Sequence, residues 1–369
     1  MLKIVFVYLG QQGGGTALDA CELAEGLSQY ADVLCVVSSK SASYKQWLIA
    51  AQNNSNLKVM GVKTTKKYLF GFLSFLNVTK FWKINRQIQK FCPDVVYSHM
   101  AHPWECMIIP TIKCKLKLKG IHDVKLHQGE DSLFQRLKNR LFSYKSNSFV
   151  VFSDFSRKEL VNQGVNKENI VSISLGCTKL LVKNRRIDLD CHKKVLFFGR
   201  LIKYKGLEVL FKSMEVVRRE HPDVKFVIAG RGEISDYSHY LSEYEDMIEL
   251  HNEWVLDEDI ERYCSEVDFV VAPYIESTQS GVVVMAYSFG KPVIVSNCGG
   301  LPEQVVVGKT GIITPVGDSQ VLGDKINELY NHEDMLREMK KNAYEYSIKH
   351  DWAYVANNLY SQIESKLSV

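Results

Sequence analysis

The chain has 369 residues, of which 46% are hydrophobic and 24% are charged, so it is ordinary globular material for two or three domains. No window approaches the run of about 18 apolar residues that predicts a transmembrane helix. The nine cysteines contain no CxxC pair, which argues against a zinc site or a disulfide framework and is typical of a cytoplasmic protein. The net charge of +4 is divided unevenly: residues 1–180 carry 24 Lys and Arg against 12 Asp and Glu, whereas residues 181–369 carry 22 against 30. This asymmetry predicts two lobes with different partners.

The first half begins with an apolar run at residues 3–9, which is too short for a secretory signal and predicts a buried β-strand. A glycine-rich loop at residues 13–15 follows, and residues 17–30 have helical spacing. Strand, glycine loop and helix is the usual start of a doubly wound α/β domain. The loop lacks the GxGxxG spacing, which argues against a dinucleotide cofactor. Further strands, indicating a parallel sheet covered on both faces, are predicted at residues 33–37, 58–60, 95–98 and 149–152.

Residues 63–90 combine seven Lys and Arg with a cluster of aromatic side chains. A basic, aromatic, amphipathic segment is typical of an anchor on an anionic membrane surface. A core helix with a solvated lysine face has the same pattern, so both interpretations stay open. Nucleic acid is not predicted as a partner, because no nucleic-acid-binding motif accompanies the charge. The residues that would meet a membrane or an acceptor are Lys63, Lys66, Lys67, Phe72 and Trp82.

His122 and Asp123 directly follow a short apolar run that ends at Ile121. Loops after the strands of α/β domains commonly carry functional groups, so His122 is a candidate for catalysis. The alternative is a polar residue whose hydrogen bonds serve only the fold. Further along, Ser156 and Glu159 have the spacing of a capping box, which predicts that a helix starts there.

Polar residues 183–194 predict a linker, after which a second series of strands and helices begins. Asp188 and Asp190 have the spacing of a metal-binding DxD pair, but they precede a strand instead of following one. We therefore interpret them as solvated linker residues and predict no metal site. The strands predicted in the second series are residues 195–198, 225–229, 249–250, 269–272, 293–295 and 311–314.

Two cations, Arg200 and Lys205, follow the first strand of this second series and precede a helix predicted from Leu207. Positive side chains at the carboxyl end of a parallel strand suit a diphosphate. They would neutralise the charge on a departing phosphate without a metal ion. The alternative, two solvated residues at a helix start, is disfavoured because cations there oppose the helix dipole.

A polar loop at residues 276–280 separates an apolar strand from a short apolar run that starts at Gly281 and that Gly290 ends. The first backbone N–H groups of a helix have no partner within the helix, and they attract phosphate. This arrangement predicts an anion site at the loop. The alternative is an ordinary polar loop that faces water.

These motifs, in this order and spacing, resemble the retaining glycosyltransferases of family 4, which have the GT-B fold of two facing Rossmann-like domains with parallel sheets. The resemblance implies an acceptor-side domain at residues 1–182, a nucleotide-sugar-binding domain at residues 183–350, and a helix at residues 351–369 that packs back on the first domain. The motifs that carry it are Gly14-Gly15, PDVV at 93–96 with His99, IHD at 121–123, FGRLIKYKG at 198–206, VIAGRGE at 227–233, the strand end at Pro273-Tyr274, AYSFGKPVI at 286–294 and GGLPE at 299–303.

The resemblance also implies roles for individual residues. His122 would lie near the reacting sugar and the acceptor, and Arg200 and Lys205 would hold the donor diphosphate and stabilise it as it leaves. The donor-binding residues that it implies are Gly14, Gly15, Gly199, Arg200, Lys205, Gly230, Glu276, Thr278, Gln279, Ser280, Gly281, Val282 and Glu303.

The sequence departs from the family pattern at one point. The family commonly has two glutamates separated by seven residues, and Ser277 and Met285 occupy those positions here. The second glutamate often binds the ribose, and the candidates to replace it are Glu303 and Glu276. The sequence therefore resembles a divergent branch of the family that carries a TQSGV loop.

On this resemblance we expect a retaining, metal-independent enzyme without a cofactor, which transfers a sugar from a UDP- or GDP-sugar to a glycan or polyprenyl-linked acceptor in surface polysaccharide biosynthesis. It would be cytoplasmic, or peripheral on the inner face of the cell membrane. Two alternatives stay open: a sugar-nucleotide epimerase of the same two-lobed fold, and a non-catalytic module that binds membranes or glycans.

Overall fold

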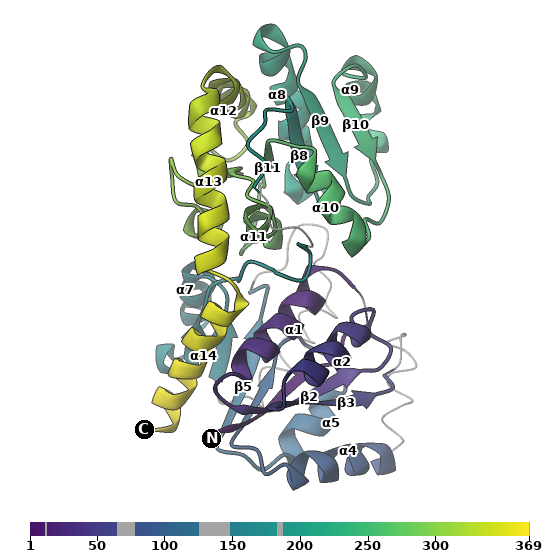
Figure 1. Cartoon of the computed structure of the whole chain (residues 1–369), viewed down its shortest axis with the longest axis vertical. Helices are drawn as coiled ribbons and strands as arrows, with labels where there is room; N and C mark the ends of the chain where they lie inside the picture. The colour runs from purple at the N-terminus through teal and green to yellow at the C-terminus, as the bar shows by residue number, and fades with distance from the viewer. Residues whose placement is uncertain (12, 65–77, 125–147, 183–186, 369) are drawn as a thin grey trace. The chain divides into compact units, whose positions relative to one another are not determined.

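The computed structural model describes residues 1–11, 13–64, 78–124, 148–182 and 187–368 (Figure 1). The described residues form two compact units. The first holds the described residues up to Gly176 and the described C-terminal residues from Trp352. The second holds the described residues between Cys177 and Asp351. Each unit is built on one parallel sheet, which confirms the predicted α/β architecture.

The first unit has a seven-stranded parallel sheet in the order β3-β2-β1-β4-β5-β6-β7. In its centre, Ile4 of β1 pairs with Val33 of β2 on one side and with Val95 of β4 on the other. The strands are β1 (Lys3–Tyr8), β2 (Asp32–Ser38), β3 (Leu57–Val62), β4 (Val95–Ser98), β5 (Leu116–Ile121), β6 (Ser148–Val151) and β7 (Ile170–Ser172). The described helices are α1 (Gly15–Leu27), α2 (Tyr44–Asn53), α4 (Val78–Lys90), α5 (Glu105–Ile108), η1 (Ile109–Thr111), α7 (Asp154–Asn162), η2 (Lys167–Asn169) and α14 (Trp352–Leu367).

The second unit has a six-stranded parallel sheet in the order β10-β9-β8-β11-β12-β13. Its strands are β8 (Lys194–Phe198), β9 (Lys225–Ala229), β10 (Ile248–His251), β11 (Phe269–Ala272), β12 (Val293–Ser296) and β13 (Gly311–Thr314). Its helices are η3 (Lys203–Lys205), α8 (Leu207–Glu220), η4 (Ser235–Tyr237), α9 (Ser238–Glu243), α10 (Asp257–Ser265), α11 (Gly281–Ser288), η5 (Pro302–Gln304), α12 (Ser319–Asn331) and α13 (Glu333–Lys349).

The order of the strands decides where a ligand can bind in each unit. In the first sheet the strand order reverses between the adjacent strands β1 and β4, and in the second sheet it reverses between β8 and β11. At such a switch point the loops from the carboxyl ends of adjacent strands turn in opposite directions and leave a crevice. The loop after β1 leads to Gly14 and Gly15, and the loop after β8 holds Gly199, Arg200 and Lys205.

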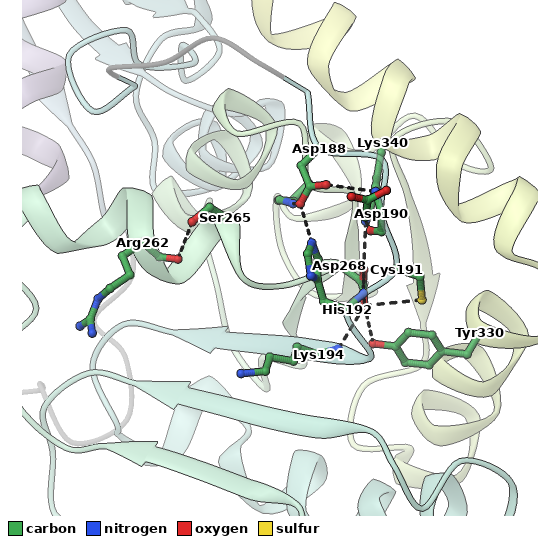
Figure 2. Close-up of polar contacts among 11 residues, drawn as sticks. Asp188, Asp190, Cys191, His192, Lys194, Arg262, Ser265, Asp268, Tyr330 and Lys340 are labelled. Atoms are coloured by element: carbon green, nitrogen blue, oxygen red, sulfur yellow. Dashed lines mark hydrogen bonds and ion pairs between the residues drawn. The ribbon is translucent and has the colours of Figure 1, made fainter.

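The opposite, amino edge of the second sheet is held by a buried carboxylate. Asp268, which is fully buried just before β11, accepts hydrogen bonds from the backbone N–H groups of His192 (2.9 Å) and Lys194 (3.1 Å) and pairs with Lys340 Nζ at 2.9 Å (Figure 2). Asp188 pairs with His192 at 2.6 Å and with the buried Lys291 at 3.4 Å. The prediction that Asp188 is merely a solvated linker residue was therefore wrong, because its carboxylate fastens the segment before β8 to the second unit.

The C-terminal helix belongs to the first unit, where α14 lies against α1 (Figure 1). The indole N–H of Trp352 donates to Asp19 Oδ1 at 3.2 Å, and the Trp352 ring packs on Gly176, where a Cβ would lie 2.7 Å from it. One turn further along, Ala356 lies against Gly26, where a Cβ would lie 2.6 Å from the Ala356 Cβ. The two helices can approach this closely because Gly26 has no side chain.

The predicted capping box was wrong about where its helix starts. α7 begins at Asp154, and its N-cap is Ser153, whose side chain accepts from the backbone N–H of Ser156 at 3.1 Å. Ser156 is thus a residue of the first turn and is itself fully buried. The spacing from Ser156 to Glu159 favoured the wrong serine, because Ser153 has Ser156 and not an acidic residue three positions later.

Candidate functional site

The loops after β8 and β9 in the second unit each begin with a glycine that has a positive φ angle. Gly199 has φ +113° and Gly230, after the neighbouring strand β9, has φ +148°. A Cβ on Gly230 would overlap the carbonyl oxygen of Gly199, while the Gly199 N–H donates to Ala229 O at 2.9 Å. Only glycine allows the two loops to meet in this way. A Cβ on Gly199 would lie 3.8 Å from the Val282 side chain, so this loop also reaches the first turn of α11.

The two predicted cations lie on the same loop, and tyrosines hold both of them. The exposed Arg200 donates from Nη2 to the Tyr204 hydroxyl at 3.1 Å. Lys205 Nζ lies 3.8 Å from the centre of the Tyr274 ring, a cation–π contact with the loop after β11. The two loops are also joined by their backbones, because the Ile275 N–H donates to Tyr204 O at 2.8 Å. The positive charge of Lys205 is therefore held beside the segment that leads into α11.

The N-terminus of α11 is fixed by side chains from two other segments. Ser280 is its N-cap, and Ser280 Oγ accepts from the Val282 N–H at 3.3 Å. The Tyr274 hydroxyl lies 3.3 Å from the same Oγ, so one tyrosine contacts both Lys205 and the cap. Gln304 hydrogen-bonds the Ser280 backbone with both ends of its amide. Gly281 is exposed, and a Cβ there would meet no atom of the described residues within 4 Å. The helix start therefore has room for a ligand in front of it.

The loop before α11 presents fewer side chains to solvent than its polar sequence suggests. Thr278 and Ser280 are 2% and 3% exposed, and Ser277, also buried, donates to Gln279 O at 3.0 Å. Met285 is buried as well. Ligand contacts at this loop would therefore come mainly from its backbone. The remaining predicted donor-binding residues of the loop and of η5 have exposed or partly exposed side chains: Glu276, Gln279, Val282 and Glu303.

In the first unit, the glycine loop leads into α1. Gly14 is the N-cap position of α1 with φ +99°, a conformation that other residues rarely adopt, and α1 has no side-chain cap. A Cβ on either Gly14 or Gly15 would meet no atom of the described residues within 4 Å. Glycine is thus required at Gly14 by the backbone angle, and both positions leave space at the start of the helix.

His122 lies at the carboxyl end of β5, within a group of rings. Its imidazole stacks on Phe152 at 4.4 Å between ring centres, and its edge meets His99 at 4.7 Å. Burial lowers the pKa of His122 to about 4, although a hydrogen bond to the His99 backbone and the charge of Asp123 both act to raise it. At pH 7 the ring is therefore neutral, and it suits hydrogen bonding better than charge stabilisation.

His99, the residue directly after β4, packs against the His122 ring. It is fully buried, it hydrogen-bonds the Tyr97 hydroxyl through Nδ1 at 2.9 Å, and it stacks on Phe6. Burial, together with His122 and Lys119, holds the pKa of His99 well below its usual value. The two histidines approach each other because Gly120 of β5 has no side chain, and a Cβ there would overlap the carbonyl oxygen of His99.

The basic, aromatic segment forms α4 in its described part. Phe81, Ile84 and Ile88 face the core, whereas Trp82 is 59% exposed and the Arg86 guanidinium lies 5.3 Å from its ring. Lys63, just after β3, is also exposed. Lys66, Lys67 and Phe72 lie outside the described residues. In the described part of the chain, no helix has the length and apolar character needed to cross a membrane, and no three His, Cys, Asp or Glu side chains are grouped as a metal site would need.

The structure adds two residues that sequence reasoning did not assign to the site, Tyr274 and Gln304. The sequence indicates Tyr274 only through the Pro273-Tyr274 motif after the predicted strand at residues 269–272, without a role at the site. Gln304 acts on Ser280, 24 residues earlier in the chain, so no local pattern could indicate it. In the second unit the structure brings the loop after β8, Lys205 and the start of α11 together, while Gly14, Gly15 and His122 lie in the first unit.

Comparison with known proteins gives a consistent picture. Residues 192–332 match the model of the family "glycosyl transferases group 1". The D-inositol 3-phosphate glycosyltransferase of Corynebacterium diphtheriae is 24% identical over 298 residues, which cover 73% of this chain and 70% of that protein. The capsular polysaccharide biosynthesis glycosyltransferase CapM of Staphylococcus aureus is 22% identical over 218 residues, 54% of this chain and 56% of CapM.

A solved structure is similar to the whole chain. The crystal structure of Anabaena HepE in complex with UDP and glucose has a TM-score of 0.74 to this protein at 19% sequence identity. The match covers 99% of this chain and 100% of the HepE chain. The predicted GT-B fold is confirmed by this likeness.

Proposed function

We propose that this chain, whose residues 192–332 match the model of the group 1 glycosyltransferases, transfers a sugar from a UDP- or GDP-sugar to a saccharide acceptor, and that its second unit binds the donor diphosphate. One observation carries the proposal. Tyr274 contacts both Lys205 and the Ser280 cap of α11, the glycine loop after β8 reaches Val282 in the first turn of that helix, and the described residues leave space beside the exposed Gly281. A cation beside a helix N-terminus is suited to a diphosphate, because both stabilise negative charge.

The same groups would stabilise the leaving group. As the bond between the anomeric carbon and the diphosphate oxygen breaks, negative charge grows on the diphosphate. Lys205 and Arg200 are positive before the reaction and are already held by Tyr274 and Tyr204, so they need little reorganisation. They supply positive charge of the kind a metal ion would supply, and this supports the proposal that transfer is metal-independent.

We propose that the sugar keeps its anomeric configuration. The acceptor hydroxyl attacks the anomeric carbon on the face from which the diphosphate leaves, and its proton passes to the departing phosphate oxygen. A new carbon–oxygen bond thus replaces the broken one without a covalent enzyme intermediate. We assign His122 to a hydrogen bond with a hydroxyl of the reacting sugar or of the acceptor, a role that suits its neutral ring.

The name of one relative and the surface of the first unit support a proposal for the acceptor class. CapM, by its name, serves capsular polysaccharide biosynthesis, and we propose a glycan or lipid-linked acceptor of a surface polysaccharide for this chain. The exposed Trp82 with Arg86 and Lys63 would allow peripheral binding to an anionic membrane. Flotation with anionic liposomes tests this: we expect Lys63→Glu with Arg86→Glu to weaken binding, and flotation unaffected by both changes would return α4 to a purely structural role.

The donor site is tested by activity with a panel of UDP- and GDP-sugars and saccharide acceptors. We expect Lys205→Ala to lower kcat/KM by about 10²- to 10³-fold, as removal of one oxyanion-stabilising group does. Lys203→Ala is the matched control, since it removes an exposed lysine of the same turn η3. NMR of the product's anomeric proton tests retention. Activity of Lys205→Ala equal to that of the control would contradict the site, and an epimerised sugar nucleotide formed without acceptor would select the epimerase instead.

A further inference from the structure

Gln304, the last residue of η5, makes a two-point contact with the backbone just before α11. Its Oε1 accepts from the Ser280 N–H at 2.8 Å, and its Nε2 donates to Ser280 O at 3.0 Å. The amide thus pairs with both backbone hydrogen-bonding groups of one residue, as a residue on a neighbouring antiparallel strand would. Both bonds are inside normal hydrogen-bond range, and Ser280 is buried, so each bond satisfies a backbone group that water does not reach.

The backbone of Gln304 is itself fixed from the interior. Its carbonyl oxygen accepts from the Tyr287 hydroxyl at 3.1 Å, and Thr310 Oγ1 donates to that hydroxyl at 2.9 Å. Tyr287 lies on α11, is fully buried and is therefore part of the rigid core of the unit. Gln304 therefore contacts α11 at two places. Its backbone carbonyl bonds Tyr287 within the helix, and its side chain bonds the N-cap residue Ser280.

The position of Ser280 matters because three parts of the proposed donor site depend on it. Its Oγ caps α11, its backbone precedes the exposed Gly281, and its hydroxyl contacts Tyr274, the ring that lies against Lys205. A rotation of the backbone at Ser280 would change the direction of the first N–H groups of α11 relative to the lysine. Sub-ångström placement of such donors governs how well they stabilise charge.

We propose that Gln304 is a positioning residue for the donor diphosphate, and that its amide fixes the backbone on both sides of Ser280 so that the N-terminus of α11 and the Lys205 ammonium act on the same ligand. This inference rests on the proposed function and adds a residue that does not itself touch the donor. The side chain must both accept and donate, so neither an apolar residue nor an ionised carboxylate can replace it.

The sharpest test is Gln304→Glu, which keeps the shape of the side chain. The ionised carboxylate still accepts from the Ser280 N–H but cannot donate to Ser280 O, and the two oxygens repel each other. We expect UDP or GDP, whichever binds more tightly, to bind about tenfold more weakly at pH 8 relative to the unsubstituted protein. At pH 5 a larger share of the introduced carboxyl groups is protonated and can donate, so the ratio of the two affinities should move back toward one.

Gln304→Leu provides the comparison without titration. It removes both hydrogen bonds, so the loss of affinity should be similar at pH 8 and pH 5. Gln320→Glu, which makes the same charge change at an exposed position on α12, should leave the affinity unchanged. Hydrogen exchange of the Ser280 amide gives a readout at the residue itself, and it should be faster in both Gln304 variants. If Gln304→Leu does not fold, the pH dependence of Gln304→Glu carries the test alone.

Nucleotide affinities of both Gln304 variants equal to that of the unsubstituted protein at both pH values would overturn the inference. So would a weakening in Gln304→Glu that does not respond to pH, since a merely structural role predicts that result. Lys205→Ala separates this failure from failure of the proposed function. If Lys205→Ala loses nucleotide binding while the Gln304 variants keep it, only the positioning role is wrong. If Lys205→Ala also binds normally, the diphosphate site itself is misplaced.

Discussion

The helices α1 and α11 both start after a parallel strand and a glycine-containing loop, yet their first residues are held in different ways. At α11, the Ser280 side chain caps the helix, Gln304 pairs with the Ser280 backbone and Tyr274 contacts the cap. At α1, the N-cap is Gly14, and no side chain caps the helix. The start of α11 is thus fixed before any ligand binds, whereas the start of α1 depends on the backbone angle of one glycine.

The two helix starts nevertheless share an electrostatic property. Neither α1 nor α11 has an acidic residue in its first turn, whereas α10 has Asp257, Glu258 and Asp259 there. Acidic side chains at a helix N-terminus satisfy the positive end of the dipole, and they would repel a phosphate. The absence of acids from α1 and α11 leaves both dipoles for an anionic ligand. We propose that the start of α11 is a rigid anion site and the start of α1 an adaptable one.

The largest effect on stability is expected at Gly230, where the loops after β8 and β9 are in contact. Gly230→Ala would place a Cβ on the carbonyl oxygen of Gly199 and force a side chain onto φ +148°. We expect the free energy of unfolding to fall by about 2–4 kcal/mol, measured by denaturant unfolding. A loss below about 0.5 kcal/mol would mean that the loops after β8 and β9 are not rigid, and the contrast with the first unit would disappear.

The histidines of the first unit should make its stability depend on pH. The pKa of His122 is about 4 in the folded protein and about 6.5 unfolded, so the unfolded state binds more protons between these values. The free energy of unfolding should therefore fall as the pH drops from about 6.5 toward 4, with about 1–2 kcal/mol lost at pH 5 through His122. Above pH 6.5 this contribution to the pH dependence disappears.

His122→Gln tests this contribution, because other groups also titrate in this range, including His99. The variant should lose less stability than the unsubstituted protein between pH 7 and pH 5 in parallel denaturant titrations. Equal losses in the two proteins would mean that His122 is solvated and ordinary, which would remove the support for a neutral ring at the site.

At the start of α1, two adjacent glycines should respond differently to alanine. Gly14→Ala puts a side chain at φ +99° and should cost about 1–2 kcal/mol of stability. Gly15→Ala meets no described atom within 4 Å and should leave stability unchanged within about 0.5 kcal/mol. If a donor approaches this backbone, Gly15→Ala will still weaken nucleotide-sugar binding. Unchanged binding in Gly15→Ala would exclude that residue from the site.

The smallest effect is expected from the N-caps. Ser280→Ala removes the cap of α11 and should cost about 1 kcal/mol, and Ser153→Ala should cost about the same at α7. Only Ser280→Ala should also weaken UDP or GDP binding, measured by isothermal titration. Equal nucleotide affinity in the two variants would indicate that the cap of α11 serves the fold alone.

Sequence patterns predicted the core strands best, because apolar runs bounded by polar residues leave few alternatives. β4, β9, β11 and β13 were predicted with the bounds that the structure gives. β5 was indicated only by its end at Ile121, because Lys117 and Lys119 interrupt its apolar pattern. Lys119 is buried in β5 and pairs with the equally buried Glu105, and a buried ion pair cannot be recognised from one of its members.

The candidate site was predicted where its chemistry is local and missed where it depends on contacts distant in sequence. Gly199, Gly230 and Lys205 stand in short motifs, and the structure gives each glycine a left-handed backbone. Thr278 and Ser280 were assigned to donor binding by the family resemblance, but their side chains are buried in the loop. Gln304 could not be found, because its partner is distant in sequence and nothing around it differs from an ordinary polar turn.

The central claim is that Lys205 and the start of α11 hold a diphosphate, and isothermal titration with UDP, UMP, GDP and GMP tests it most directly. We predict that the diphosphate of the preferred base binds at least about tenfold more tightly than its monophosphate, and that this advantage disappears in Lys205→Ala. Equal affinity for the diphosphate and the monophosphate, or an advantage that persists in Lys205→Ala, would contradict the account.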